Sequence, residues 1–534
     1  MHASTENTAK TILLGSDTEI SHFWVSGNRS DENRSTDMML LGRLRGLPAH
    51  ALSTRGALEL GRRFDDRNGA CYYSELGHLE ACTPLCAGPR ELVAYTEANR
   101  RRIREAQHAC NSSFSDGSHI TAMFESRCGR GRNSVSIGTH VNYLVDRRTW
   151  TKICSGQFPA VAGFVASAVA GIQLIAGQGC VGSANRRPPV DYQISQRSDF
   201  ITRVACVDTM GQMGRGLINT RDEPECGPQD PRRKPHARFH HICLDFPINE
   251  YALYATTGIM SVLLAAVSED FVAPQLILAD PVNTFWQWSH DPKMATRALL
   301  ADGTGITSSD YLARIIEFLS RAAGRAELVR YVPETFEIID AAAASSDALT
   351  RKDWCFLSRR IDWVNKYRIL AHAIAANSSL DWSSSQIAML DQLYGSVDPT
   401  DSLYLAQRDN GEIDRLIDDA IAARALAGPP ETTRSWGHTM LLRRIKADPD
   451  FEPLYLNWDE ITVRHKRGAV YTVRFSDPRV MTRADCASAF THESTEDVLC
   501  ALASTEPVPN RSLYTVCAAD RGNHSSNAPE RSEV

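Results

Sequence analysis

The stretch N-G-A-C-Y-Y-S-E-L-G-H-L-E-A-C-T, residues 68–83, is the part of the sequence from which fold and chemistry are best inferred. Its opening Asn-Gly is a turn signal, and the residues that follow have the extended pattern of a strand. Side chains at positions i, i+2 and i+4 of a strand lie on the same face. We therefore expect Cys71, Tyr73 and Glu75 to point in the same direction.

His78 and Glu80 follow this predicted strand directly after Gly77. The stretch thus supplies two carboxylates, a phenol and an imidazole, which can form an oxygen-rich site for a hard cation such as magnesium. Taken alone, it is also compatible with an ordinary charged surface loop, because short motif-like matches often mislead. The choice between these interpretations depends on the rest of the chain.

A second acidic pair lies in the segment T-I-L-L-G-S-D-T-E-I near the N-terminus, which is expected to form a strand. Asp17 and Glu19 are two residues apart and would share one face of it. Clustered carboxylates repel one another unless a cation joins them, and clustered arginines favour an anion. Together with Arg197, Arg221 and Arg238, the acids would suit magnesium bound to phosphate oxygens. The alternative is that each charge is an independent surface charge or structural ion pair.

The composition is that of a globular chain of 534 residues, of which 43% are hydrophobic and 23% charged. The net charge of −6 gives no electrostatic case for nucleic acid as a partner. The 14 cysteines form no C-x-x-C pair and are interpreted as reduced thiols of a cytoplasmic protein, and no signal-peptide pattern is present. The most membrane-like segment, residues 158–176, is predicted to be a buried core helix, so no membrane partner is expected.

Hydrophobic periodicity predicts helices over residues 91–109, 251–268, 311–323 and 361–374, one or two helices within 38–64, and a helix that carries Ile413, Leu416, Ile417 and Ile421. Strands are predicted over residues 11–20, 134–145, 190–201 and 238–244, with a loop over 26–37 and a hairpin over 461–475. Four arginines are expected on the solvated face of the 91–109 helix, namely Arg100, Arg101, Arg102 and Arg104.

These strands and helices are interspersed without the regular alternation of a doubly wound sheet. We therefore expect an α+β fold with an antiparallel sheet. Gly428 and two prolines end the last predicted helix of a large domain that would span residues 11–428. A small C-terminal α+β domain is expected over residues 429–500. Residues 518–534 lack periodicity and are expected to be a disordered tail.

One motif is a false match. Residues 177–182, G-Q-G-C-V-G, formally fit the dinucleotide-binding fingerprint, with Asp199 further along. That site requires a strand before the glycines and a helix after them. Here an alanine-rich helical run comes first, and the N-R-R-P-P that follows cannot open a helix. A Rossmann site is therefore rejected, and the chain also lacks a P-loop motif.

Several short motifs occur in the order found in one enzyme family. They are G-S-D-T-E at 15–19, N-G-A-x-x-Y at 68–73, H-x-E-x-x-T at 78–83, H-x-N-Y at 140–143, G-x-G-x-V-G at 177–182, Q-I-S-Q-R at 193–197, I-N-T-R-D-E-P at 218–224, S-H-D at 289–291, I-D-W-V-x-K at 361–366 and P-P-E-T-T-R at 429–434. With these motifs the chain resembles the Pup ligase and Pup deamidase/depupylase family over residues 11–478. The resemblance implies a glutamine-synthetase-like fold, in which helices pack against a curved antiparallel sheet that forms a cradle.

The resemblance also implies an ATP–magnesium site and catalytic residues. Asp17, Tyr73 and Glu80 would hold magnesium, with Glu19 nearby. Glu75 stands where the family has a catalytic aspartate. A carboxylate there can deprotonate an attacking lysine or act on an amide carbon.

The nucleotide would be bound by residues from distant segments. By the same resemblance, Thr83 and Trp458 would contact the nucleotide, and Arg197 and Arg221 would contact its phosphates. Magnesium and arginine would stabilise the negative charge that develops during the reaction.

The family acts on the side-chain carboxyl or amide of the last residue of Pup, a small disordered protein modifier. The implied partners are therefore a Pup-like modifier and its conjugates, in connection with the proteasome pathway. The motifs around residues 193–200 and 215–224 favour a deamidase/depupylase, which hydrolyses the side-chain amide or isopeptide. D-T-E at 17–19, together with the short interval from Glu19 to Asn68, favours a ligase that joins the modifier's C-terminal glutamate to a lysine.

The chain departs from the family pattern close to the predicted site. Cys71 replaces an arginine that contacts ATP, Asp17 replaces a glutamate, Glu75 replaces an aspartate, and Val141 replaces a glutamate. Residues 244–248, L-D-F-P-I, also replace a run that resembles G-D-S-N-M in the family. The changes at Cys71 and Val141 support a third interpretation, an inactive nucleotide- or Pup-binding regulator.

Overall fold

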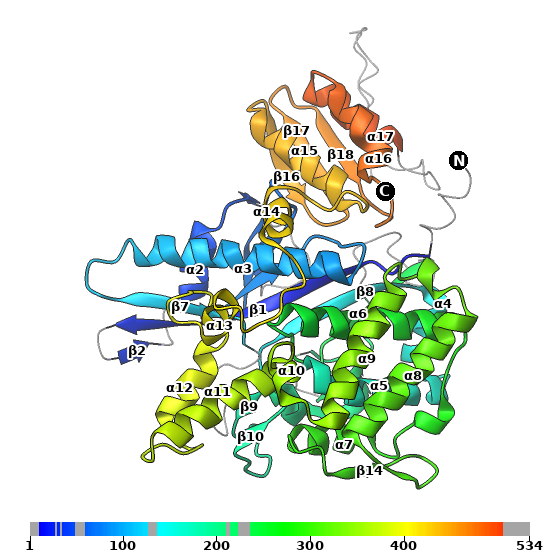
Figure 1. Cartoon of the computed structure of the whole chain (residues 1–534). Coiled ribbons are helices and arrows are strands. Elements are labelled where there is room, and N and C mark those ends of the chain that lie inside the picture. The colour runs from blue at the N-terminus through cyan, green and yellow to red at the C-terminus, as the bar shows by residue number, and fades with distance from the viewer. Residues whose placement is uncertain are drawn as a thin grey trace, which may run out of the picture.

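The computed structural model describes residues 10–26, 29–31, 35–48, 59–125, 136–209, 214–222 and 235–505. They form a large body built on one long sheet and a smaller C-terminal unit that lies over one end of that sheet (Figure 1). The tail predicted at residues 518–534 lies outside the described residues. The two domain spans expected from the sequence stay a prediction.

The long sheet has 11 strands in the described residues, and its main path runs β11-β12-β13-β8-β1-β6-β5-β4-β3. The strands of this path are β1 Leu14–Ser26, β3 Leu47–Pro48, β4 Glu59–Phe64, β5 Cys71–Glu75, β6 His78–Cys82, β8 Thr139–Asp146, β11 Ile201–Cys206, β12 Arg215–Asn219 and β13 His236–His241. Two further strands, β2 (Arg29–Asp31) and β7 (His119–Met123), pair with the second half of β1. Within these residues only β11 and β12 pair in parallel, so the expected α+β fold with an antiparallel sheet is confirmed.

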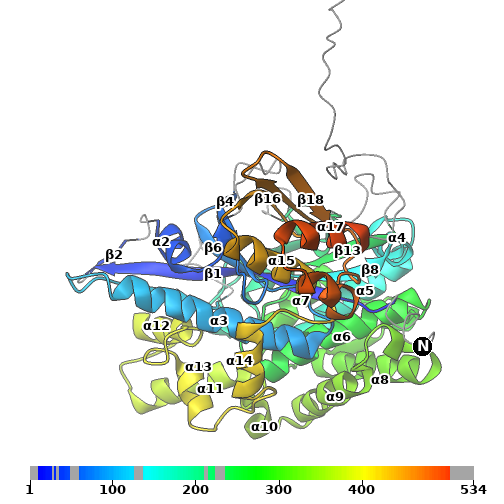
Figure 2. The same cartoon turned by 90° about the horizontal axis from the view of Figure 1, so that it is seen from above.

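Helices cover one face of the sheet in two layers (Figure 2). The inner layer is α3 (Pro89–Asn111), α5 (Pro159–Ala176) and α6 (Glu250–Ser268), and α8 (Ser308–Arg325) and α9 (Thr335–Arg351) pack outside it. Alternate strand residues, such as Tyr143 of β8 and Phe239 of β13, join the core between sheet and helices. The predicted helices at 91–109, 251–268 and 311–323 are confirmed.

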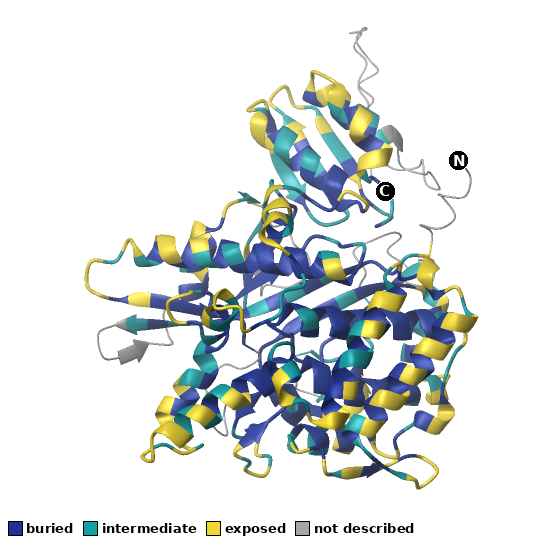
Figure 3. Cartoon of the chain, viewed as in Figure 1, coloured by how far each residue is buried: buried dark blue, intermediate teal, exposed yellow. Residues whose placement is uncertain are grey.

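Two helices of the described chain are long and apolar enough to cross a membrane by length and composition. These are α5 and α6, and 72% and 89% of their apolar windows are buried inside the protein. Both are dark blue in Figure 3, which marks buried residues. The prediction that residues 158–176 form a buried core helix is confirmed.

The remaining elements of the large body are short. They are α2 Thr36–Arg43, α4 Arg147–Cys154, α7 Pro281–Ser289, α10 Trp354–Ser358, α11 Asp362–Ala376, α12 Ser385–Leu393, α13 Leu403–Asp409 and α14 Asp419–Ala427, with the strand pairs β9 (Cys180–Val181) and β10 (Tyr192–Gln193), and β14 (Arg297–Leu299) and β15 (Gly305–Thr307). The glycine-rich run at 177–182 leads into β9 and not into a helix, so the rejection of a Rossmann site is confirmed.

The C-terminal unit combines a three-stranded sheet with helices. Its elements are α15 Ser435–Ala447, β16 Phe451–Leu456, β17 Glu460–His465, β18 Val470–Arg474, α16 Arg483–Cys486 and α17 Thr495–Thr505. The hairpin predicted over residues 461–475 is confirmed as β17 and β18. The core of the unit is continuous with side chains of the long sheet, including Phe64 and Cys71.

The helices predicted within residues 38–64 are confirmed only in part. Helix α2 ends at Arg43, and residues 59–64 form the strand β4. The chain turns at Gly46, whose φ is +145°. A Cβ at Gly46 would lie 2.5 Å from the carbonyl oxygen of Phe64, so β4 runs directly against this backbone. This close approach favours strand pairing here over a longer helix.

The strand predicted over residues 190–201 is also largely wrong. Only Tyr192–Gln193 is extended there, a 3-10 helix follows over Gln196–Phe200, and β11 begins at Ile201. The buried Asp199 carboxylate accepts hydrogen bonds from the Ala184 amide at 2.7 Å and from the Gln193 side chain at 3.0 Å. These local polar contacts outweigh the alternation of the sequence.

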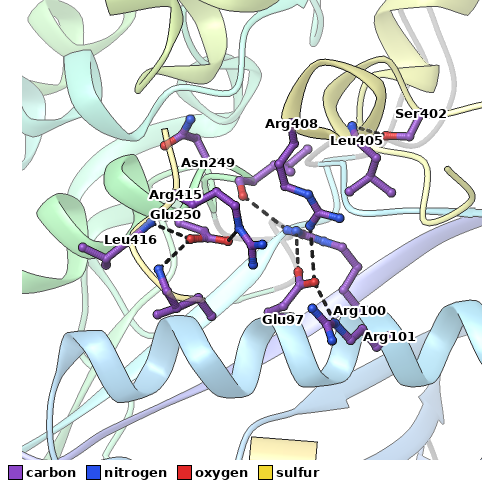
Figure 4. A network of polar contacts seen from close by, with 12 residues as sticks. Glu97, Arg100, Arg101, Asn249, Glu250, Ser402, Leu405, Arg408, Arg415 and Leu416 are labelled. Carbon is purple, nitrogen blue, oxygen red and sulfur yellow. Dashed lines mark hydrogen bonds and ion pairs between the residues drawn. The ribbon is translucent and has the colours of Figure 1, made fainter. Parts of the chain in front are cut away.

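The helix predicted to carry Ile413, Leu416, Ile417 and Ile421 starts only at Asp419. The amides of Leu416 and Ile417 donate to Glu250 Oε2 at 2.7 and 2.9 Å, as Figure 4 shows for Leu416. Because these donors are used by a carboxylate of α6, the chain stays irregular until Asp418 caps α14.

The arginines of α3 were expected to be solvated, but two of them are buried. Arg100 donates to Glu97 Oε2 at 2.9 Å, and Arg101 and Arg408 bind the other oxygen of Glu97 (Figure 4). Arg102 is buried against Asp65. Their burial depends on segments distant in sequence, such as Ile248, whose carbonyl accepts from Arg100, and Asp65, so the helix pattern alone gave no sign of it.

Candidate active site

The polar residues of the predicted site lie on the face of the sheet away from the helices, which we call the polar face. The register places Glu19 of β1 opposite Glu80 of β6, and Glu80 opposite Tyr73 of β5. The Tyr73 hydroxyl donates a hydrogen bond to Glu80 Oε2 at 2.9 Å. Asp17 lies in the neighbouring row, opposite Cys82. The two acidic segments, residues 14–26 and 78–82, therefore lie side by side on one sheet.

The turn between β5 and β6 fixes this register. Its central residues, Leu76 and Gly77, both have positive φ, 52° and 84°. Two positive φ values are typical of the tight turns that match the twist of a hairpin. Glu75 is then opposite His78, and its partly buried side chain shares the polar face.

The carboxylates of this cluster disfavour one another's charge. Burial raises the pKa of Glu80 well above its usual range, and the carboxylates of Glu19, Asp17 and Glu75 raise it further. Burial also raises the pKa of Asp17, although the Arg238 guanidinium opposes the shift. Carboxylates that raise one another's pKa favour a cation bound among them.

The donor chemistry of the cluster fits magnesium. Carboxylate and phenol oxygens are hard ligands, and magnesium commonly binds through one or two carboxylates while it keeps several waters. Among the described residues, no three or more His, Cys, Asp or Glu side chains are already arranged to hold a metal ion. The ion would therefore be held with water and substrate phosphate as well as protein ligands. The magnesium role of Asp17, Glu19, Tyr73 and Glu80 stays a prediction.

A hydrogen-bonded chain continues from Asp17 into the next two strands. Asn142 of β8 donates to Asp17 Oδ2 at 3.1 Å, and its own oxygen lies 2.7 Å from His240 Nδ1 of β13. The ring of His140 lies 5.0 Å from the ring of His240. His140 and Asn142 are two residues apart in the strand predicted over 134–145 and so share one of its faces, but neither was predicted as a site residue. The alternation of His140 and Asn142 with apolar residues is the sequence signal that could have placed them on the polar face.

Arginines surround this second half of the site. Burial lowers the pKa of His140 well below its usual range, and Arg197, Arg215, Arg238 and Arg221 lower it further. A neutral imidazole among arginines suits a bound anion such as phosphate. Arg215 was not predicted as a site residue, although it begins the motif R-G-L-I-N-T-R. Arg221 lies just beyond β12, where its amide donates to Asn219 Oδ1 at 2.9 Å.

Arg197 joins the arginine half of the site to the acidic half. Its buried guanidinium donates from Nε to the carbonyl oxygen of Ile242 at 2.8 Å. It passes over Gly138, where a Cβ would lie 2.1 Å from Nη1. The Gly138 amide in turn donates to Glu19 Oε2 at 2.6 Å. Only glycine at position 138 allows this approach, and the phosphate role of Arg197 stays a prediction.

The predicted nucleotide contacts lie at the opposite end of the acidic half. Thr83 Oγ1 is buried and accepts a hydrogen bond from the Ser16 amide at 3.0 Å. Trp458 belongs to the C-terminal unit, and its ring lies edge-on to Phe64 of β4 with 5.0 Å between centroids. The neighbouring Asn457 accepts a hydrogen bond from Arg62 at 3.2 Å. The C-terminal unit thus reaches the edge of the acidic cluster, and the nucleotide roles stay predictions.

A large cavity lies near the arginine half. Its volume is about 1490 Å³, and Gln196, the residue before Arg197, lines it. Its walls are rich in aromatic and basic side chains, among them Tyr192, Trp363, Tyr367, Trp382, Lys293, Lys352 and Arg368. The rings of Tyr367 and Trp382 are stacked with 5.2 Å between centroids. Apolar walls with a basic rim are suited to an amphipathic, acidic peptide.

Comparison with known proteins identifies relatives of the chain. A family model described as Pup-ligase protein matches residues 21–462. The Pup deamidase/depupylase of Mycolicibacterium smegmatis is 29% identical over 381 residues, which cover 71% of this chain and 72% of that protein. The Pup–protein ligase of Acidimicrobium ferrooxidans is 28% identical over 414 residues, which cover 77% of this chain and 85% of that protein.

Solved structures show the same fold. The complex between Pup and its ligase PafA matches with a TM-score of 0.74 and 21% identity, and covers 93% of this chain and 94% of that chain. The Pup ligase PafA in complex with ADP matches with a TM-score of 0.65 and 23% identity, and covers 79% and 87%. The mixed sheet-and-helix architecture is therefore one that is known from this group of proteins.

Proposed function

Because the chain belongs to the Pup-ligase protein family, whose model matches residues 21–462, we propose that it is an ATP- and magnesium-dependent enzyme of Pup modification. Its substrate would be the C-terminal glutamate or glutamine side chain of a Pup-like modifier, free or in a conjugate. Relatives named for both activities, hydrolysis and ligation, support an enzymatic role. We place the protein in the cytoplasm, in keeping with the absence of disulfides among the cysteines of the described residues.

The observation that carries this proposal is the division of the polar face into two halves. Asp17, Glu19 and Glu80 form a carboxylate cluster in which like charges raise the pKa of Glu80. Arg197 and Arg215 stand beside it, and burial lowers the pKa of both. Magnesium would join the carboxylates, and the phosphates of ATP would bind the arginines. A solved relative with ADP bound is in keeping with a nucleotide here.

For the chemical step, Glu75 is the proposed base. It shares the polar face with Tyr73 and Glu80, and its partly buried side chain extends from the end of β5. In hydrolysis, its carboxylate takes a proton from the water that attacks the side-chain amide or isopeptide carbon. Arg197 and Arg221 orient and neutralise anionic oxygens, and bound magnesium would supply further charge stabilisation there.

Two activities remain candidates, and each has an observation in its favour. Hydrolysis is the leading one, because the motifs around residues 193–200 and 215–224 resemble those of deamidases/depupylases. Ligation is favoured by D-T-E at 17–19 and by the similarity to PafA. In ligation, Glu75 would take its proton from the attacking lysine amine.

The large cavity is the proposed docking place of the modifier. It is lined by Gln196, next to Arg197, so a peptide seated in it would lead toward the polar face. The residues that line it include three basic ones, Lys293, Lys352 and Arg368, and one acidic one, Asp191. This charge balance favours an acidic segment with apolar side chains.

The test uses purified protein with Mg-ATP and three substrates, each followed by mass spectrometry. Pup ending in glutamine and a Pup conjugate test hydrolysis, and Pup ending in glutamate with a lysine-bearing protein tests ligation. We expect Glu75→Gln to lower the active reaction by about 100-fold or more. Glu105→Gln, an exposed acid on α3, is the matched control. Failure of all three reactions would contradict an enzymatic role and favour the regulator.

A further inference from the structure

Two cysteines lie directly opposite each other on the polar face. Cys71 of β5 and Cys82 of β6 are paired in the register of the hairpin, and both are buried. Directly opposed residues of an antiparallel pair have Cα atoms about 4.5–5.5 Å apart, within the range of about 4.4–6.8 Å that a disulfide requires. Their side chains are on the same face, because opposite residues of neighbouring strands always are.

This cysteine pair adjoins the acidic cluster. Cys82 is also opposite Asp17 of β1, so the two side chains project from neighbouring positions of the polar face. A disulfide between Cys71 and Cys82 would therefore form directly beside a predicted magnesium ligand.

We propose that Cys71 and Cys82 are an oxidant-sensitive pair that forms a disulfide under peroxide and thereby weakens the adjoining metal site. One cysteine gives up its proton and attacks hydrogen peroxide as the thiolate; the O–O bond breaks, the departing hydroxide takes up the proton and leaves as water, and a sulfenic acid remains. The second thiol displaces the hydroxyl of that sulfenic acid as a second water, and the S–S bond forms. The two thiols are oxidised by two electrons, and one peroxide is reduced to two waters.

The disulfide changes the surroundings of Asp17. Once Cys82 is bonded to Cys71, the side chain opposite Asp17 is fixed to β5 and its thiol is lost, while Asn142 still donates to Asp17. A change in the groups around a metal ligand commonly lowers metal affinity. This consequence rests on the proposed magnesium role of Asp17, whereas formation of the disulfide does not.

The C-terminal unit shields the pair. Cys71 and Cys82 belong to the same apolar cluster as Trp436, Leu441 and Phe475 of that unit. Peroxide therefore reaches them more slowly than it reaches Cys355, which is exposed. Oxidation of Cys355 is accordingly an internal measure of how much peroxide the protein has received.

The experiment maps the disulfide in the full-length protein. Hydrogen peroxide is added, remaining thiols are alkylated, and the unreduced protein is cut with a protease that cleaves after glutamate. Cleavage after Glu59, Glu75, Glu80 and Glu91 separates Cys71, in fragment 60–75, from Cys82, in fragment 81–91. We expect these two fragments to be joined, and to separate after dithiothreitol. Fragment 81–91 also contains Cys86, so Cys86→Ser serves as the matched control and should leave the link intact, whereas Cys82→Ser should remove it.

The result that would overturn the proposal is that fragments 60–75 and 81–91 stay unlinked at a peroxide dose far above the one that fully oxidises Cys355. A link that disappears in Cys86→Ser would overturn it as well. As the functional measurement, Mg-ATP binding is titrated before and after oxidation, and we expect the Kd to rise about 10-fold or more and to recover with dithiothreitol. If the link forms and the reduced protein binds no Mg-ATP, the proposed function fails and the disulfide stands. If the link forms and the Kd is unchanged, the claimed effect on the metal site is wrong.

Discussion

Two buried carboxylates of this protein have opposite surroundings. Glu97 on α3 is enclosed by Arg100, Arg101 and Arg408, and although burial alone would raise its pKa, the arginines hold the value below its usual range. Glu80 on β6 has other carboxylates as neighbours, and its pKa is raised well above the usual range. Asp419 binds Arg101 and Asp409 binds Arg408, so the Glu97 cluster has three acids for three arginines and is a neutral network. Such a network serves the fold, whereas a cluster of like charges points to a ligand.

The largest effect is expected from breaking the neutral network. Glu97→Ala leaves the buried Arg100 without its carboxylate and leaves the partly buried Arg408 with Asp409 alone, so we expect the free energy of unfolding to fall by about 3–5 kcal/mol. Denaturant titration measures it. Glu105→Ala removes an exposed partner of Arg102 on the same helix and is the control, with little expected change. A loss of equal size in both variants would show that the helix, and not the network, is sensitive.

The second effect is on ligand binding. Here we expect a loss of affinity without a loss of stability, the opposite of what we expect for Glu97→Ala. Glu80→Gln removes a repelled charge but keeps an oxygen that can accept the Tyr73 hydrogen bond. We expect unchanged or slightly higher stability without metal, and Mg-ATP affinity lower by about 100-fold, roughly 2.7 kcal/mol. Calorimetric titration with and without a chelator measures both. A variant that binds Mg-ATP like the wild type would remove Glu80 from the metal site.

The two carboxylates should also differ in their response to pH. Glu80 has a folded-state pKa above its value of 4.5 in the unfolded chain, so without metal its contribution to stability is lost as the pH rises above 4.5. Glu97 has a lowered pKa, so its contribution is present above 4.5 and is lost as the pH falls below it. Each group changes the slope of stability with pH by at most about 1.4 kcal/mol per unit.

The comparison of slopes uses the same two positions. Glu80→Gln should make stability fall less between pH 4.5 and neutral, and magnesium should have a similar effect because it competes with the proton. Glu97→Gln should make stability fall less in acid. Unfolding curves at a series of pH values test both expectations, and identical slopes in all three proteins would contradict them.

The smallest effect is expected at the rim of the neutral network. Arg101 binds Glu97 and also the exposed Asp419, and its side chain is 20% exposed. Because solvent screens this pair, Arg101→Ala should lower stability by about 0.5 kcal/mol. A loss as large as that of Glu97→Ala would mean that the network depends on all its members equally.

The acidic cluster could be predicted from the sequence in part, whereas the arginine network around Glu97 could not. The acidic row followed from alternation within two strands, because side chains two residues apart share a face whatever lies around them. Its register depended on the turn at Leu76 and Gly77, where leucine adopts a positive φ that its residue type does not indicate. The strand pairing of Asp17 and Glu19 with β6 crosses a long stretch of chain and could be expected only from the resemblance.

The burial of the α3 arginines could not be predicted from the sequence around them. Arg408 lies 311 residues from Glu97, and a run of arginines on a helix is usually solvated. Similarly, residues 59–64 contain no alternation that indicates a strand, and β4 forms because its backbone pairs with β5 and lies against Gly46. In each case a tertiary contact outweighs the local pattern.

The contact between the C-terminal unit and the edge of the acidic cluster bears on biosynthesis. Arg62 and Asn457 are separated by 395 residues, and Trp458 covers Phe64 from the same place. When a ribosome has delivered the long sheet and its helices, the apolar side chains of Phe64 and Cys71 still have no cover. If Trp458 has its proposed nucleotide role, we expect a nascent chain to bind Mg-ATP only after its C-terminal unit has emerged and docked.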